Sequence, residues 1–153
     1  MAIRKFRKAD LSGVSALIRR TFSEFNSREA TKEGTKLYLE LMSLSNPQLL
    51  TSYMDSTSYV YCEGKKLFGV VRAKEDMVKN LFVDGRHHGK AIGTRLLEKA
   101  ESEIWKKGHK SIRIRSSIYA VPFYLRRGYK KTTGVRSFHG LRIQPMMKRD
   151  ISK

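Results

Sequence analysis

The sequence predicts an α/β domain in which helices flank one mixed sheet. Apolar residues make up 40% and charged residues 30% of the 153-residue chain, which is ordinary usage for a folded domain of this length. The apolar spacing follows the order strand, helix, helix, three strands, helix, strand, helix, two strands. No linker interrupts this order, so we expect a single domain over residues 1–153.

The first half begins with a short strand and a helix. Asp10 precedes apolar residues at helical spacing from Leu11 to Phe22, and we expect it to cap that helix. A polar stretch follows, and residues 36–55 predict a helix that Asn46-Pro47 interrupts before a second short one.

The centre of the chain predicts three strands and a long helix. Short turns separate residues 58–63, 66–74 and 77–84, so these strands should be antiparallel neighbours. From residue 91 to 107 the apolar positions form one helical face, and Gly108 supplies the stop.

The last part predicts a strand over 111–117 and a short helix with Pro122 in its first turn and Gly128 after its end. Two strands around a polar turn should complete the sheet.

Charge is concentrated in the second half. The formal net charge is +18; residues 1–76 hold 13 basic and 9 acidic side chains, whereas residues 77–153 hold 19 and 5. Such a field attracts phosphates, nucleic acids or acidic substrates without selecting among them.

Cysteine content and hydropathy limit the cellular context. The only cysteine, Cys62, excludes an internal disulfide and a cysteine-cluster metal site, and we expect it to be buried. The N-terminus has no apolar signal region and no run of about 18 apolar residues occurs, so we expect a cytoplasmic protein without membrane contact.

The turn at residues 85–91 predicts an anion site. A strand leads into it and a helix opens at about Gly89, where unpaired N–H groups suit phosphate oxygens. Gly89 permits close approach, Arg86 and Lys90 add positive charge, and Ala91 is small. The spacing matches neither a Walker A loop nor a dinucleotide fingerprint, so we expect neither nucleoside triphosphate nor nicotinamide binding.

Two blocks resemble the GNAT-type N-acetyltransferases. Arg86, Gly89 and Ala91 fit the (Gln/Arg)-x-x-Gly-x-(Gly/Ala) signature, although residue 85 is glycine where proline is common. The second block matches the later motif of the family, with serine where asparagine is frequent: Ser117, Ala120, Phe123, Tyr124, Gly128 and Tyr129. The resemblance implies a mostly antiparallel sheet of about six to seven strands with about four helices, whose fourth and fifth strands splay apart.

The resemblance also implies a cosubstrate and a binding site. Acetyl-CoA would donate its acetyl group to an attacking amine of a small molecule, peptide or protein, without a metal. Backbone groups of Leu81, Phe82 and Val83 would pair with the pantetheine arm. Amides from Arg86 to Ile92 would hold the pyrophosphate. The cofactor-binding residues after the strand are then Arg86, His87, His88, Gly89, Lys90, Ala91, Ile92, Gly93, Ser117, Ala120 and Phe123.

Tyr124 is the candidate general acid, because it matches the family position that protonates the leaving thiolate. The alternative is a tyrosine whose ring fills core. Glu75 is a candidate base, with Asp76 and Glu63 as further candidates, although each also fits a solvated turn. We expect His87 and His88 to flank phosphates and not to bind a metal, because adjacent rings in a turn rarely converge on one ion.

Two other functions remain open on this fold. A nucleic-acid-binding module would use the same basic second half, and a coenzyme-A-binding sensor would bind the cofactor without turnover. The charge in excess of the cofactor's needs also suggests an acidic partner, and a homodimer is possible.

Overall fold

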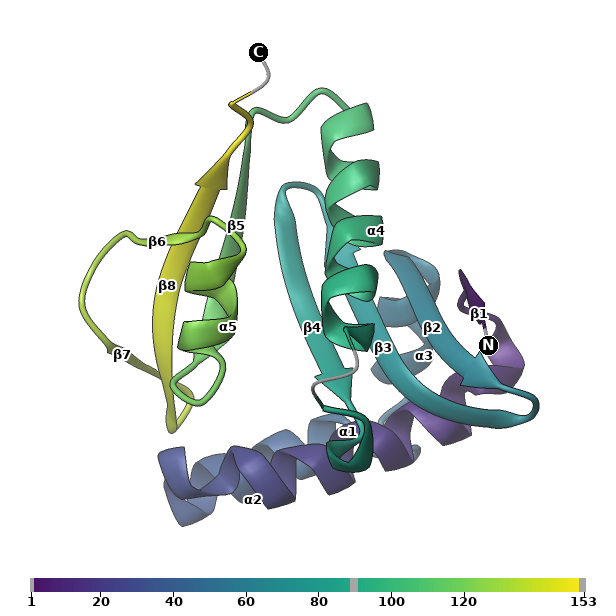
Figure 1. Cartoon of the computed structure of the whole chain (residues 1–153). Helices are drawn as coiled ribbons and strands as arrows, with labels where there is room; N and C mark the ends of the chain where they lie inside the picture. Colours follow the sequence, from purple (N-terminus) through teal and green to yellow (C-terminus); the bar gives the residue numbers. More distant parts are fainter. Residues whose placement is uncertain (1, 89–90, 152–153) are drawn as a thin grey trace.

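The computed structural model describes residues 2–88 and 91–151 and contains one eight-stranded sheet with helices against it (Figure 1). The strands are β1 (Ala2–Lys5), β2 (Thr57–Glu63), β3 (Lys66–Lys74), β4 (Met77–Val83), β5 (Ser111–Ser117), β6 (Lys130–Lys131), β7 (Arg136–Phe138) and β8 (Leu141–Arg149). The α-helices are α1 (Leu11–Phe25), α2 (Lys32–Leu41), α3 (Gln48–Met54), α4 (Ile92–Lys106) and α5 (Val121–Arg126). Three single 3₁₀ turns are η1 (Lys8–Asp10), η2 (Ser27–Glu29) and η3 (Gly85–His87).

The sheet confirms the predicted mixed, mostly antiparallel architecture. Its order is β1-β2-β3-β4-β5-β8-β6, and β7 pairs with β8. Only β4 and β5 run parallel among the strand pairs of the described chain. The strand count exceeds the expected one because β6 and β7 are too short to show an apolar period.

Strands β4 and β5 part soon after they pair, as the resemblance implied. Only Met77 with Arg113 and Val78 with Ile114 are partners in this pair. Beyond them the two strands diverge, which Figure 1 shows as a widening gap between β4 and β5. The last residues of β4 therefore have a sheet neighbour on the β3 side only.

The register with β3 decides which main-chain groups of β4 face the gap. Asp84 N–H donates to Phe68 C=O at 2.8 Å, so this opposed pair is hydrogen-bonded. Antiparallel pairs alternate between bonded and non-bonded. Val83 is opposite Gly69 and Leu81 is opposite Val71, so both are non-bonded pairs. The N–H and C=O groups of Val83 and Leu81 therefore point away from β3 into the gap.

Two apolar layers hold the helices to the sheet. On one face α4 contributes Leu96, Leu97 and Ile104 to a core shared with β2 to β5. On the other face α1 and α3 pack on β2 and β3 through residues such as Leu17 and Tyr53, beside the buried Cys62. Among the described residues, none of the helices is both long and apolar enough to cross a membrane.

The expected capping bond of Asp10 is not made. Asp10 precedes α1, but its carboxylate accepts two hydrogen bonds from the Arg4 guanidinium, both at 2.8 Å, and one from the Arg7 N–H at 2.7 Å. A bidentate pair with arginine is stronger than a neutral cap bond. Asp10 therefore ties β1 to the turn before α1.

The start of α2 docks closely on the β7–β8 turn. Thr31 N–H donates to Gly140 C=O at 2.9 Å, and the Thr31 hydroxyl caps α2 by accepting from Gly34 N–H at 2.9 Å. A Cβ on Gly34 would lie 2.7 Å from the Gly140 carbonyl carbon. This contact is between two backbones, so neither side can yield by rotating a side chain.

Replacing Gly34 with Ala should therefore destabilise the protein by about 1–3 kcal/mol, because α2 has to move away from the hairpin. Gly13→Ala is the matched control, since Gly13 also lies in a helix but its Cβ would meet only Leu67, at 3.7 Å. The control should gain up to about 1 kcal/mol from helix propensity. Urea unfolding measures both, and equal effects would contradict the close contact.

Candidate active site

A cavity of about 680 Å³ opens where β4 and β5 separate. Its walls come from the end of α1, the end of β4, the start of α4, α5 and the beginning of β8. The early parting of the two strands thus produces this hollow.

Most of the predicted site residues line this cavity. They are Leu81, Phe82, Val83, His87, His88, Ala91, Ile92, Gly93, Ser117, Ala120, Phe123 and Tyr124. Arg86 is exposed and does not line it. Gly89 and Lys90 lie outside the described residues, so their predicted roles stay predictions.

The open edge of β4 provides hydrogen-bonding groups to the cavity. The main-chain groups of Leu81 and Val83 face the gap, whereas those of Phe82 face β3 by the same alternation. One of the open groups is in use, since the Val83 C=O accepts from His88 Nε2 at 2.7 Å. We expected Leu81, Phe82 and Val83 to pair with the pantetheine arm through their main chain, but only Leu81 and Val83 have main-chain groups that face the cavity.

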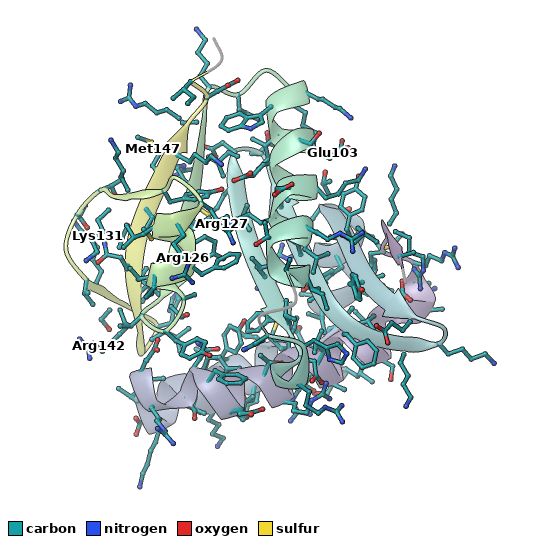
Figure 2. The ribbon with its side chains drawn as sticks, in the orientation of Figure 1. Glu103, Arg126, Arg127, Lys131, Arg142 and Met147 are labelled. Atoms are coloured by element: carbon teal, nitrogen blue, oxygen red, sulfur yellow. The ribbon has the colours of Figure 1, made fainter. Side chains whose placement is uncertain are left out.

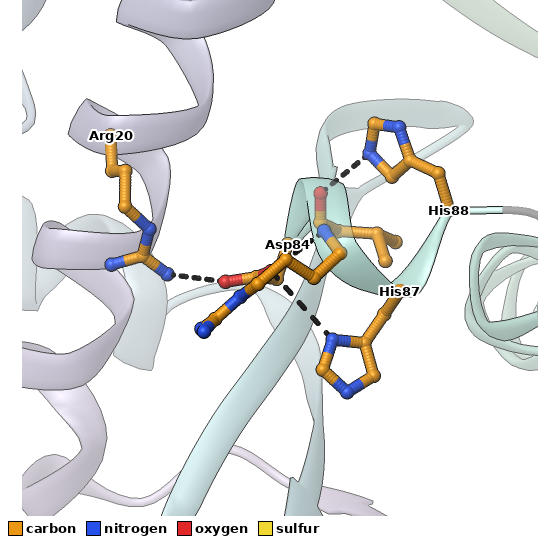
Figure 3. A network of polar contacts seen from close by, with 6 residues as sticks. Arg20, Asp84, His87 and His88 are labelled. Atoms are coloured by element: carbon orange, nitrogen blue, oxygen red, sulfur yellow. Dashed lines mark hydrogen bonds and ion pairs between the residues drawn. The ribbon is translucent and has the colours of Figure 1, made fainter.

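Asp84 organises the turn after β4 (Figure 3). Its buried carboxylate accepts from Arg20 at 2.9 Å, from Arg86 N–H at 2.9 Å and from Arg86 Nε at 3.3 Å. Burial disfavours the ionised form, but the bonds from Arg86 and Arg20 outweigh it and hold the pKa of Asp84 well below its usual range. A permanent charge at this point fixes α1 and the turn to the end of β4.

This arrangement corrects the predicted use of the loop amides. The N–H of Arg86 is taken by Asp84, that of His87 by the Asp84 C=O at 2.9 Å, and that of His88 by the Gly85 C=O at 3.3 Å. These amides are not free to hold a phosphate, because the chain folds into η3 on its own acceptors.

The amides without an acceptor in the helix lie at the end of the predicted range from Arg86 to Ile92 and just beyond it. Helix α4 begins at Ile92, and its first backbone bond runs from Arg95 N–H to Ala91 C=O at 3.0 Å. The N–H groups of Ile92, Gly93 and Thr94 precede this bond, so they lack an acceptor within the helix. Ala91 has φ of 62°, in the left-handed region, which turns the chain into the helix.

The two histidines point in different directions (Figure 3). The His87 ring stacks on Phe68 with centroids 4.0 Å apart, and its Nδ1 lies 3.6 Å from Asp84. The His88 ring instead packs against Phe25. No group of three or more His, Cys, Asp or Glu side chains in the described ranges is arranged to hold a metal ion.

Helix α5 joins the start of α4 across the cavity. Gly93 lies against the Phe123 ring, and Arg127 Nε donates to the Thr94 hydroxyl at 3.0 Å. Figure 2 shows Arg126 and Arg127 next to each other on α5, and both line the cavity. These arginines were not predicted as site residues, although the basic sequence around Arg126 was one signal for them.

Tyr124 lines the cavity as a buried, protonated tyrosine. Its ring is buried and meets Tyr129 edge to face, with centroids 5.5 Å apart. Burial raises the pKa of Tyr124, and the negative charge of Glu101 adds to the shift. Tyr129 donates to Glu101 at 2.7 Å, whereas the Tyr124 hydroxyl has no hydrogen-bond partner among residues 2–88 and 91–151.

None of the three candidate bases lines the cavity that Tyr124 lines. Glu75 is exposed in the β3–β4 turn with φ of 53°, at the end of β4 remote from Val83, and it does not line the cavity. Asp76 is paired with Arg113 at 2.8 and 2.9 Å, and Glu63 lies opposite Lys66 at the β2–β3 turn.

An unpredicted carboxylate, Glu29, does line the cavity. It accepts from the N–H groups of Ile118 and Tyr119, both at 2.8 Å. The polar stretch that contains it gave no sign of this pairing across 89 residues.

Replacing Asp84 with Asn should destabilise the protein by about 1–3 kcal/mol at neutral pH, because a buried charged acceptor is lost. A lowered folded pKa stabilises the protein above the unfolded pKa of about 3.9 and ceases to do so as the pH falls further. The difference between wild type and variant should therefore be constant above about pH 5 and shrink below about pH 4. Asp55→Asn is the control, since Asp55 is exposed. Unfolding curves at a series of pH values measure both, and a difference that grows in acid would contradict this assignment.

Comparisons with known proteins agree with the geometry. A family model described as an acetyltransferase (GNAT) domain matches residues 23–149. The comparison with curated proteins gave no match.

Solved structures share the fold at low sequence identity. A GCN5-related N-acetyltransferase from Rhodopseudomonas palustris is 18% identical over 97% of this chain and 95% of its own, with a TM-score of 0.85. The PaiA N-acetyltransferase from Thermoplasma acidophilum, in complex with coenzyme A, is 21% identical over 97% and 98%, with a TM-score of 0.77. An aminoglycoside 6'-N-acetyltransferase complexed with coenzyme A is 18% identical over 97% of both chains, with a TM-score of 0.65. Since the family model covers most of the chain, the protein belongs to the GNAT family of acetyltransferases, which use acetyl-CoA.

Proposed function

We propose that the protein transfers the acetyl group of acetyl-CoA to an amine acceptor in this cavity, with Tyr124 as the general acid. The observation that carries the proposal is the meeting of three features in one hollow. They are the open edge at Leu81 and Val83, the N-terminal amides of α4, which have no acceptor within the helix, and the side chain of Tyr124.

The residues of the cavity suit acetyl-CoA. Leu81 and Val83 offer main-chain donors and acceptors that no strand satisfies, which fits an amide-containing pantetheine arm. The amides of Ile92, Gly93 and Thr94 and the positive end of α4 fit phosphate groups. Arg126 and Arg127 add charge beside them. The coenzyme A complexes of two proteins with this fold support the assignment.

Acetyl-CoA, when bound, supplies an acetyl thioester that an amine can attack. The Leu81 N–H faces the cavity and can polarise a carbonyl oxygen there, a role worth roughly 10²–10³ in rate for other enzymes. The Phe82 N–H faces β3 by the alternation above, so of these two neighbouring residues we assign the role to Leu81.

Tyr124 is suited to donate the proton that the chemistry needs. Its Oη is protonated at neutral pH, and its hydroxyl has no competing partner among the described residues. The acceptor amine must lose a proton before it attacks. Because Glu75 is remote and both oxygens of Glu29 accept backbone N–H groups, we assign that removal to water in the cavity.

Tyr124→Phe should lower kcat by about 10²-fold or more while the KM for acetyl-CoA changes little, because only the donated proton is lost. Tyr59→Phe is the matched control: Tyr59 is also buried but does not line the cavity. Thiol release with a panel of amines measures both. An unchanged kcat for Tyr124→Phe would refute the acid role.

Calorimetry with acetyl-CoA tests the cofactor assignment itself. We expect binding that weakens as salt is raised, since the phosphates meet cations and helix amides. Absence of binding at moderate salt would refute the proposal and a sensor function alike, whereas binding without thiol release would favour the sensor.

A further inference from the structure

We propose, as an extension of the proposed function, that the acceptor is a small amine that also carries a carboxylate, held by Lys79, Asn80 and Thr21 where β4 leaves β5. All three residues line the cavity. The proposal concerns the acceptor, whose chemical class the family membership does not specify.

Asn80 lines the cavity with its side-chain amide held in a fixed orientation. The residue is 8% exposed, and its Oδ1 accepts from Tyr53 Oη at 3.1 Å and from Arg72 Nε at 2.9 Å. Two donors on the oxygen determine the orientation of the amide. Its Nδ2 has no acceptor within the described ranges, so this group is left to donate to a ligand.

Thr21 is a second unsatisfied polar group on the same cavity. The residue is 5% exposed, and its Oγ1 is buried without a hydrogen-bond partner among the residues described. A buried hydroxyl without a partner costs free energy, and such groups in native structures usually have a specific reason. A carboxylate oxygen of the acceptor would accept from this hydroxyl.

Lys79 supplies the positive charge. It is the first residue of β4 after the last pair with β5, and Arg115 holds the equivalent position on β5. Lys79 is exposed, but partial desolvation lowers its pKa, and the positive charges of Arg115, Arg72 and Arg113 lower it further. Arg113 is paired with Asp76, but neither Lys79 nor Arg115 has a carboxylate partner in the described chain.

The charges that line the cavity also disfavour an acceptor with a second positive charge. Glu29 is the only acidic side chain among the described residues that line the cavity. Both of its oxygens accept backbone N–H groups, from Ile118 and Tyr119. A diamine would therefore meet Lys79 without a free carboxylate to balance it, whereas an amino acid would place its carboxylate there.

The experiment compares the common L-amino acids with their carboxamides, each supplied as a pool with acetyl-CoA, and identifies the acetylated products by mass. Wild type should acetylate amino acids in preference to the amides. Lys79→Gln should lower the ratio of the two kcat/KM values about tenfold. Lys66→Gln, which neutralises an exposed lysine remote from the cavity, should leave the ratio unchanged.

Thr21→Val gives a second variant that should still fold, because it removes an unsatisfied hydroxyl at nearly constant shape. It should also lower the ratio. Acetylation of both pools with a ratio that neither variant changes would overturn this proposal while leaving the proposed function intact.

A binding measurement separates the two proposals further. Without acetyl-CoA, the amino-acid pool should shift the side-chain amide signal of Asn80 in ¹⁵N-resolved NMR, and the carboxamide pool should not. Equal shifts, or none, would overturn the acceptor assignment even if no amine is acetylated.

Discussion

The structure depends on one constraint: β4 and β5 pair through only two residues each before they part. Parallel strands that stayed paired would satisfy the main chain of Leu81 and Val83 and close the cavity. Their separation is held from both sides, because α4 packs on β4 and β8 pairs with β5 along its whole length. The packing of the core therefore maintains the gap between β4 and β5.

Polar contacts then hold the loops around the gap. Asp84 fixes the end of β4 to α1 through Arg20 and shapes the turn through Arg86. Glu29 binds the loop before α5 from the opposite side. Because both carboxylates are engaged with the protein, the groups left for ligands are mostly donors and cations. The concentration of positive charge seen in the sequence thus has a local counterpart in the cavity.

The sequence was sufficient for the elements that have a clear apolar period. The three antiparallel strands and α4 lie within a residue or two of their predicted bounds, and the resemblance correctly implied the splay. Local motifs were less reliable where a distant partner competes. Asp10 was expected to cap α1, but Arg4 takes its carboxylate, and the amide of Arg86 is used by Asp84.

The cavity lining was predicted in part for the same reason. Residues on β4, α4 and α5 follow from the motifs, whereas Glu29, Thr21 and Asn80 belong to the site only because the fold brings them there. Tyr53 and Arg72 donate to Asn80 Oδ1 and so leave its Nδ2 as the group that can donate to a ligand. These two residues are 27 and 8 positions away from Asn80, so no local sequence pattern predicts the arrangement.

The central claim is that the open edge of β4 receives acetyl-CoA. Hydrogen exchange resolved to single amides tests it most directly, with and without acetyl-CoA. The account predicts that Leu81 and Val83, whose N–H groups face the gap, become protected, while Phe82, already bonded to β3, changes little. Protection confined to the basic surface outside the cavity, with Leu81 and Val83 still exchanging freely, would contradict it.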